Sequence, residues 1–150
     1  MSTEPRLQLE VITPGGVVLR EEVEYVEAPG VLGYVGILPG HAPFLTRIRS
    51  GRLEYRLDGE DHVLAVHWGY LEVLDDDVVV LAETAERPDD IELQRADDAL
   101  RRARERQEEF GAAYDPLRAE RAAERARTRI DVVRAQSGTG ADDPPGATRN

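Results

Sequence analysis

Lysine and cysteine are both absent from this chain of 150 residues. Without cysteine, neither a disulfide framework nor a zinc–thiolate site can form. Without lysine, the chain has no Walker-type phosphate loop, because that loop places a lysine on the bound phosphates. Every cationic side chain other than histidine is therefore an arginine, and any recognition of anions depends on guanidinium groups.

Long apolar runs are also absent. No run approaches the ~20 residues that a membrane-spanning helix needs. The first six residues, Met-Ser-Thr-Glu-Pro-Arg, contain no apolar signal region. We therefore expect a soluble, cytoplasmic protein with no direct membrane insertion.

The net charge of −11 is unevenly distributed. Residues 1–86 carry 16 acidic side chains and 6 arginines, whereas residues 87–136 carry 12 of each. An acidic N-terminal part argues against nucleic acid as a partner, since phosphates require clustered cations. It also disfavours adsorption to anionic lipid.

Up to Glu86, the sequence is a series of short alternating or apolar segments separated by turn residues. Turns are expected at residues 14–16, at Asp58-Gly59 and at residues 75–77, and Gly69 is expected to interrupt a strand. This pattern is typical of a β-sandwich or flattened barrel, which we assign to residues 1–87. The expected strands are 7–11, 17–26, 44–48, 51–57, 62–68, 70–74 and 78–82.

After Glu86, apolar residues recur at the spacing of an α-helix. Pro88, followed by Asp89 and Glu92 at capping-box spacing, predicts a first helix that ends at Gly111. Asp115-Pro116 predicts the start of a second helix, with the aspartate as N-cap. We therefore expect an α-helical hairpin over residues 88–136, followed by a disordered tail over 137–150. Its apolar stripes are Ile91, Ala96, Ala99, Leu100, Ala103 and Phe110, and then Ala119, Ala122, Ala126, Ile130 and Val133.

The alanine-rich stripes bury little area, at about 25 cal/mol per Å². The hairpin should therefore be weakly held, both to itself and to the sandwich.

Residues 27–45 combine buried-type side chains with four glycines and three prolines. One interpretation is a tight corner of an all-β core. The other is a presented surface loop that ends in His41.

Residues 36–43, Gly-Ile-Leu-Pro-Gly-His-Ala-Pro, resemble the signature of the epsilon subunit of bacterial F-type ATP synthases. Three further segments agree in order and spacing: residues 11–16, 69–73 and 80–87. The resemblance extends from about Leu7 to about Ala135.

The resemblance implies a central-stalk rotor subunit at the cytoplasmic face of the bacterial cell membrane. Its sandwich would dock on the gamma subunit and the ring of c subunits and help couple proton flow to ATP synthesis. Its hairpin would switch to an extended state that reaches the catalytic alpha and beta subunits and inhibits ATP hydrolysis. Chemistry would be done elsewhere in the complex. Residues assigned to the gamma and c-ring interface are Leu32, Tyr34, Gly40, His41 and Pro43.

The helices also contain candidate nucleotide contacts. Spacing places Arg95 and Arg102 on one face, and Arg125 and Arg129 on another. On the bare sequence, an exposed helix with Glu/Arg pairs is the more common explanation of such a pattern. Some epsilon subunits bind ATP through an Ile/Leu-Asp-x-x-Arg-Ala motif, and here Ile91-Glu-Leu-Gln-Arg-Ala96 is similar, with Glu92 in place of Asp. The resemblance implies a regulatory ATP, not a required cofactor, on Glu86, Ile91, Glu92, Arg95, Ala96, Arg102, Arg125 and Arg129.

No catalytic or metal-binding set is apparent. The histidines at 41, 62 and 67 lack ligand spacing, the aspartates at 75–77 sit in a solvated turn, and Ser50 and Ser137 have loop surroundings. Two alternatives to the rotor subunit stay open. One is a free-standing ATP-sensing module, and the other is a small β-sandwich enzyme.

Overall fold

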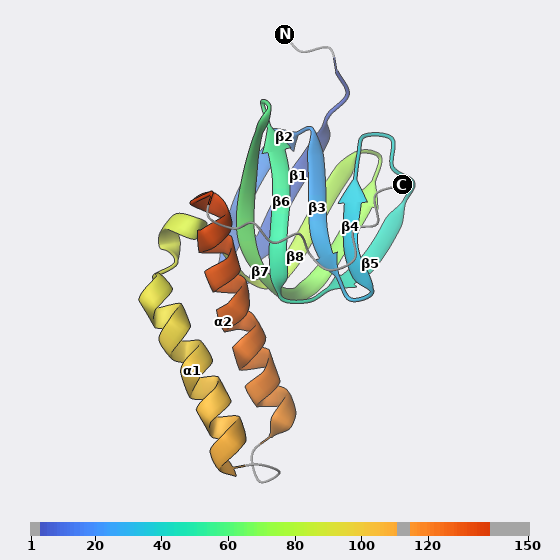
Figure 1. Cartoon of the computed structure of the whole chain (residues 1–150). Coiled ribbons are helices and arrows are strands. Elements are labelled where there is room, and N and C mark those ends of the chain that lie inside the picture. Colours follow the sequence, from blue (N-terminus) through green and yellow to red (C-terminus); the bar gives the residue numbers. More distant parts are fainter. Residues whose placement is uncertain (1–3, 111–114, 139–150) are drawn as a thin grey trace, which may run out of the picture.

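Eight strands form one continuous sheet that folds over into two layers (Figure 1). The computed structural model describes residues 4–110 and 115–138. The strands are β1 (Leu7–Thr13), β2 (Gly16–Val23), β3 (Tyr25–Gly30), β4 (Gly33–Ile37), β5 (Phe44–Ile48), β6 (Gly51–Leu57), β7 (Glu60–Leu74) and β8 (Asp77–Glu86).

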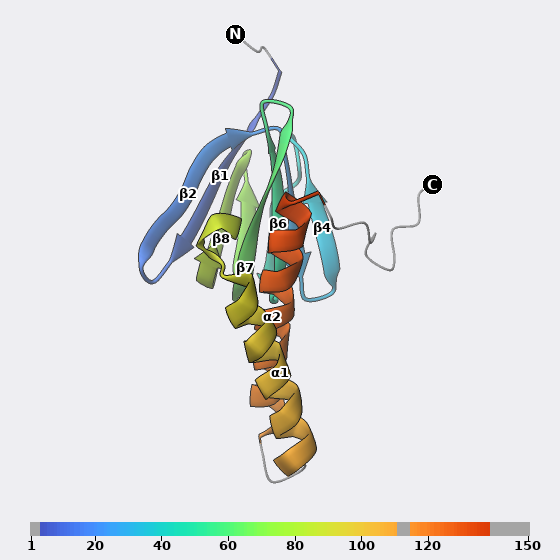
Figure 2. The same cartoon turned by 60° about the vertical axis from the view of Figure 1, so that its left-hand side comes forward.

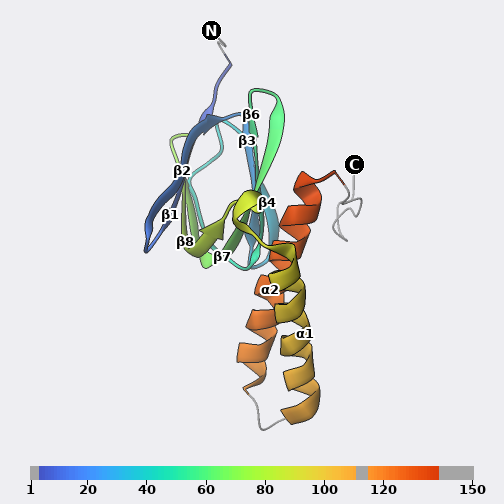
Figure 3. The same ribbon diagram turned by 90° about the vertical axis from the view of Figure 1, so that its left-hand side faces the viewer.

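The strand order is β2-β1-β8-β7-β5-β3-β4, and β6 pairs with both β3 and β7. Pairing is antiparallel except between β1 and β8, which run parallel. Seen from the side, the two layers face each other across the core (Figures 2 and 3). The predicted β-sandwich or flattened barrel with a C-terminal helical hairpin is confirmed.

Strand β7 belongs to both layers because it bends at Trp68 and Gly69. Its first part pairs with β6 as far as Val66, and its second part pairs with β5 from Gly69 onward. The prediction that Gly69 interrupts the strand is wrong. Gly69 has φ 154°, and a side chain there would overlap the carbonyl oxygen of Leu81. A glycine therefore lets the strand turn the corner and stay paired with β8 on both sides of the bend.

The core lies between the layers and takes residues from every strand, with clear alternation in β1, β6 and the second part of β7. Leu9, Val26, Leu53, Leu64 and Leu71 are among its fully buried members. Burial of every second residue explains why the alternation in the sequence predicted these strands.

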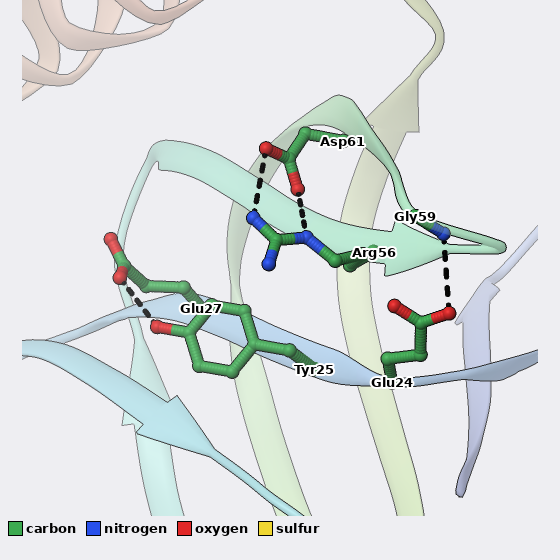
Figure 4. Close-up of polar contacts among 6 residues, drawn as sticks. All are labelled: Glu24, Tyr25, Glu27, Arg56, Gly59 and Asp61. Carbon is green, nitrogen blue, oxygen red and sulfur yellow. Dashed lines mark hydrogen bonds and ion pairs between the residues drawn. The ribbon is translucent and has the colours of Figure 1, made fainter. Parts of the chain in front are cut away.

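The expected single strand over residues 17–26 is two strands. The strand is interrupted at Glu24, between β2 and β3, where the chain crosses from one layer to the other. The carboxylate of Glu24 accepts a hydrogen bond from the backbone N–H of Gly59 at 3.2 Å, which fastens this crossing to the β6–β7 hairpin (Figure 4). Arg56 holds Asp61 with two hydrogen bonds, of 2.8 and 3.1 Å, across the same hairpin.

The helical part starts differently from the prediction. A short 3₁₀ helix, η1 (Pro88–Asp90), follows β8, and helix α1 (Leu93–Phe110) begins only after Glu92. Asp89 is therefore not the N-cap of α1, and its carboxylate instead accepts a hydrogen bond from the Gln136 side chain at 3.2 Å. The predicted helix end at Gly111 lies outside the described residues.

Helix α2 (Pro116–Gln136) begins as expected. The Asp115 carboxylate accepts hydrogen bonds from the backbone N–H groups of Leu117 and Arg118, so it is the N-cap. The buried side of α2 is broader than the predicted stripe and consists of Ala119, Ala123, Ala126, Thr128, Ile130 and Val132.

Helix α2 attaches the hairpin to the sandwich. It packs on β6 and β7, and α1 packs along α2 and projects beyond the end of the sandwich (Figures 1 and 3). Ala96 and Ala103 are the buried apolar residues of α1 among those described. The predicted disordered tail lies outside the described residues from position 139 onward.

Candidate functional site

A cavity of about 410 Å³ lies where β8 passes into the hairpin. It is lined by Glu86, Asp90, Ile91, Glu92, Arg95, Ala96, Ala99, Arg102 and Arg129. Its walls come from the end of β8, from η1 and the first turns of α1, and from the second half of α2. The two halves of the helical hairpin and the sandwich therefore all contribute to it.

The candidate nucleotide residues gather at this place. All of them except Arg125 line the cavity. Arg125 lines an adjoining cavity of about 190 Å³, which shares Arg102 and Arg129 with the first. Spacing along each helix predicted which arginines share a face, and the packing of α1 on α2 brings the two faces together.

Glu86 is held from two sides. One carboxylate oxygen, Oε1, accepts hydrogen bonds from Arg129 Nε at 2.8 Å and from His67 Nε2 at 3.2 Å. The hydrogen bond from His67, together with Arg129, holds the pKa of Glu86 below its usual range, although burial acts in the opposite direction. Glu86 is therefore an ionised carboxylate at neutral pH.

Several guanidinium groups around the smaller cavity have no acidic partner. Within the described residues, Arg102, Arg106 and Arg125 form no ion pair, and all three line this cavity beside Arg129. Alanines at positions 99, 103, 119 and 122 line the rest. Unpaired guanidinium groups gathered at one point suit a polyanion, because each presents a planar fork of donors.

The Glu92 side chain lines the larger cavity and has one weak ion pair, with Arg95. Its carboxylate is 4.0 Å from Arg95 Nε, and both side chains are mostly exposed. Such a pair contributes at most about 1 kcal/mol to stability. Neither residue is committed to a structural role, so both are available to a ligand.

Two residues of the site were missed by the sequence analysis. His67 Nδ1 lies 3.1 Å from Ser50 Oγ, so Ser50, His67 and Glu86 form one hydrogen-bonded chain. Ser50 lies in the loop between β5 and β6, as expected, but its side chain is buried there beside His67. Ser50 and His67 are 7% and 1% exposed, so this serine cannot meet a substrate. Their burial opposite a helix could not be seen from strand alternation alone.

The candidate interface residues divide between the two ends of the sandwich. Leu32 lies at the tip of the β3–β4 turn and is fully exposed, whereas Gly40, His41 and Pro43 follow β4 at the other end. Tyr34, in β4, is partly buried, and its hydroxyl accepts a hydrogen bond from the backbone N–H of Arg52.

The loop that carries His41 is shaped by local contacts. The N–H of Gly40 donates to the Asp76 carboxylate at 2.7 Å, so this aspartate supports the loop and is more than a solvated turn residue. The ring of His41 packs edge-on against Phe44. Leu38, next to this loop, is 60% exposed and was not among the predicted interface residues.

Membrane-spanning helices and metal-binding clusters are absent from the described part of the chain. None of the helices in residues 4–110 and 115–138 is long and apolar enough to cross a membrane. Over the same ranges, no three side chains of histidine, aspartate or glutamate gather where they could hold a metal ion.

The sequence matches the family described as "ATP synthase, Delta/Epsilon chain, beta-sandwich domain" over residues 6–88. It is 48% identical over 129 residues to the ATP synthase epsilon chain of Geotalea daltonii, covering 85% of this chain and 94% of that one. It is 54% identical over 98 residues to the ATP synthase epsilon chain of Citrifermentans bemidjiense, covering 65% of this chain and 71% of that one.

Solved structures share the fold. A chain of the Euglena gracilis mitochondrial ATP synthase assembly of OSCP, F1 and c-ring has a TM-score of 0.76 at 20% identity, covering 91% of this chain and 84% of that one. A chain of the Tetrahymena thermophila mitochondrial central stalk and c-ring has a TM-score of 0.53 at 14% identity, covering 93% of this chain and 100% of that one.

Proposed function

The chain belongs to the family of ATP synthase delta and epsilon chains, and from this premise we propose a function in the central stalk. It would join the gamma subunit to the ring of c subunits at the cytoplasmic face of the bacterial cell membrane and couple proton flow to ATP synthesis. The expectation of a non-catalytic subunit of an enzyme complex is confirmed by this membership.

Two partners require two contact surfaces, and the sandwich offers exposed apolar side chains at both ends. Leu32 and its neighbour Val31 are exposed at one end, and Leu38 is exposed beside His41 at the other. Because the Leu32 end is apolar, its contact with a partner should depend weakly on salt. An affinity that falls steeply with ionic strength would contradict this assignment.

The hairpin would regulate ATP hydrolysis by leaving the sandwich and extending toward the catalytic alpha and beta subunits. The observation that supports this is its narrow attachment, because α2 supplies the helical contacts with the strands and alanines make up much of the buried surface. With an attachment of this kind, the folded and extended states of the hairpin can be close in free energy. A ligand that binds one of these states shifts the population toward it.

ATP is our candidate for that ligand, bound in the folded hairpin. The cavity lined by Glu86, Arg102 and Arg129, and the unpaired guanidinium groups beside it, support the proposal. Calorimetry with the full chain at millimolar ATP tests it. Arg102→Ala and Arg125→Ala should weaken binding, whereas Arg104→Ala, an exposed arginine of α1 outside both cavities, should not. Absence of heat with the wild-type chain would refute ATP binding.

The subunit assignment is tested by reconstituting the catalytic complex of the same organism with the full chain or with a chain cut after Arg87. We expect both to assemble and only the full chain to slow ATP hydrolysis. If both assemble and neither inhibits, the chain couples without regulating. If neither binds gamma, the alternative of a free-standing ATP-sensing module is favoured.

A further inference from the structure

His67 is hydrogen-bonded on both ring nitrogens, although it lies almost wholly inside the protein. Its Nδ1 faces Ser50 Oγ at 3.1 Å, its Nε2 faces Glu86 Oε1 at 3.2 Å, and the side chain is 1% exposed. We infer that His67 is a positioning residue that fixes the Glu86 carboxylate for a nucleotide bound in the hairpin site. This inference rests on the proposed nucleotide site.

The partners of the ring determine which nitrogen carries the proton. An ionised carboxylate only accepts hydrogen bonds, so Nε2 must be the donor toward Glu86. In the neutral ring, Nδ1 is then an acceptor, and the hydroxyl of Ser50 donates to it. Ser50, in the β5–β6 connection, thus holds the ring in the form that Glu86 requires.

Glu86 needs such support because of its place in the fold. It is the last residue of β8, where the chain leaves the sheet, and its side chain is 27% exposed. A free glutamate there would sample several rotamers, and fixing it on ligand binding would cost conformational entropy. A carboxylate that is already fixed avoids that cost.

The two hydrogen bonds on Glu86 come from different elements. His67 donates from the sheet, and Arg129 donates from α2 to the same oxygen. The carboxylate therefore stays at the junction between the sandwich and the hairpin, where it also lines the cavity with Arg95 and Arg102. His67 contributes to the site through Glu86, since His67 does not itself line the cavity.

The alternative role for His67 is simple packing, and a conservative substitution separates the two. His67→Gln would retain a side-chain N–H donor toward Glu86, whereas His67→Leu would fill the space without one. If His67 only packs, His67→Gln should be at least as harmful as His67→Leu. If His67 positions Glu86, His67→Gln should restore much of the affinity that His67→Leu loses.

The experiment is calorimetry of ATP binding to the full chain, with thermal melting to verify folding. We expect His67→Leu to bind about tenfold more weakly, and His67→Gln and Ser50→Ala within about threefold of wild type, on the scale of one hydrogen bond to a charged group. His62→Gln, in a histidine that instead stacks on Tyr55, is the matched control and should bind like wild type.

Wild-type affinity in His67→Leu, or equal losses in the leucine and glutamine variants, would overturn the inference while leaving the ATP proposal intact. No binding by the wild-type chain would overturn the ATP proposal and, with it, the nucleotide role of His67. In that case ¹⁵N NMR of the free chain still tests the positioning of Glu86. A proton on Nε2 supports it, and a ring protonated only on Nδ1 overturns it.

Discussion

The guanidinium group of Arg121 lies over the indole ring of Trp68, with its central carbon 4.8 Å from the ring centroid. Trp68 stands at the bend of β7 with φ 45°, and Arg121 lies in the first half of α2. This contact and the Glu86–Arg129 ion pair connect the sandwich to the hairpin at two separate points.

Replacing Arg121 should loosen the hairpin. Arg121→Gln removes a cation–π contact worth about 0.5–2 kcal/mol. Trp68 is the single tryptophan of the chain, so its emission should shift to the red as the ring becomes exposed. Arg118→Gln, an exposed arginine of the same helix, is the control and should leave the spectrum unchanged. Identical spectra for both variants would show that Arg121 does not hold the hairpin.

Acid should weaken the attachment through Glu86. Its pKa is lowered in the folded state, chiefly by the hydrogen bond from His67, so its stabilising effect is complete above the unfolded pKa and is lost as the pH falls through the folded pKa. Glu86→Gln should cost about 1 kcal/mol at neutral pH and nothing in strong acid. Denaturant titrations followed by Trp68 emission measure this difference, and a cost independent of pH would refute it.

Glu54 should have the opposite pH dependence. Burial, with help from Glu27 and Asp61, raises its pKa against the effect of Arg52. Its contribution to stability is therefore complete below the unfolded pKa and lost as the pH rises through the folded pKa.

The expected result is that Glu54→Gln stabilises the sandwich at neutral pH by about 0.2–0.5 kcal/mol. Glu27 lies directly opposite on β3, but the Glu54 side chain is 38% exposed, so solvent screens the repulsion. The gain should disappear once the pH is low enough to protonate Glu54. Chemical denaturation at several pH values provides the measurement. A loss of stability at neutral pH would mean that the Arg52 ion pair outweighs burial.

A methyl group at Gly69 should prevent proper folding of the sandwich. Gly69→Ala would collide with the Leu81 carbonyl at the bend of β7, at a cost above about 3 kcal/mol. Gly59→Ala is the matched control, because Gly59 has φ 80° but open space around it, so only about 1 kcal/mol should be lost. Equal melting temperatures for the two variants would show that the bend can relax.

The sequence predicts the fold well because the spacing of its apolar residues differs between the two parts. The strands bury one face, so apolar residues alternate, whereas in the helices they recur at helical spacing. The strands around Leu9 and Leu53 alternate, and Asp115 marks the start of α2 by its capping chemistry. The corner at Gly69 was misjudged, since a glycine that ends a strand and a glycine that bends one look alike in sequence.

The site could be predicted only in part. Arg102 and Arg129 were identified through helical spacing, which is local in sequence, and through the family resemblance. Ser50, His67 and Glu86 are brought together by strand pairing, although the hydrogen-bonded partners are 17 and 19 positions apart in the sequence. No local pattern encodes that arrangement, so it became visible only in the folded chain.

The attachment of α1 through α2 determines how the hairpin could move. Arg87, between β8 and η1, donates a hydrogen bond to the Val18 carbonyl, so the base of the hairpin is tied to β2. Release of α2 from β6 and β7 would free both helices in one step and leave residues 87 and 88 as the hinge. The free energy needed to release the hairpin would then be set by the contacts that α2 makes with the sandwich, among them Arg121 on Trp68 and Arg129 on Glu86. Substitutions along the outer face of α1 should therefore leave that free energy unchanged.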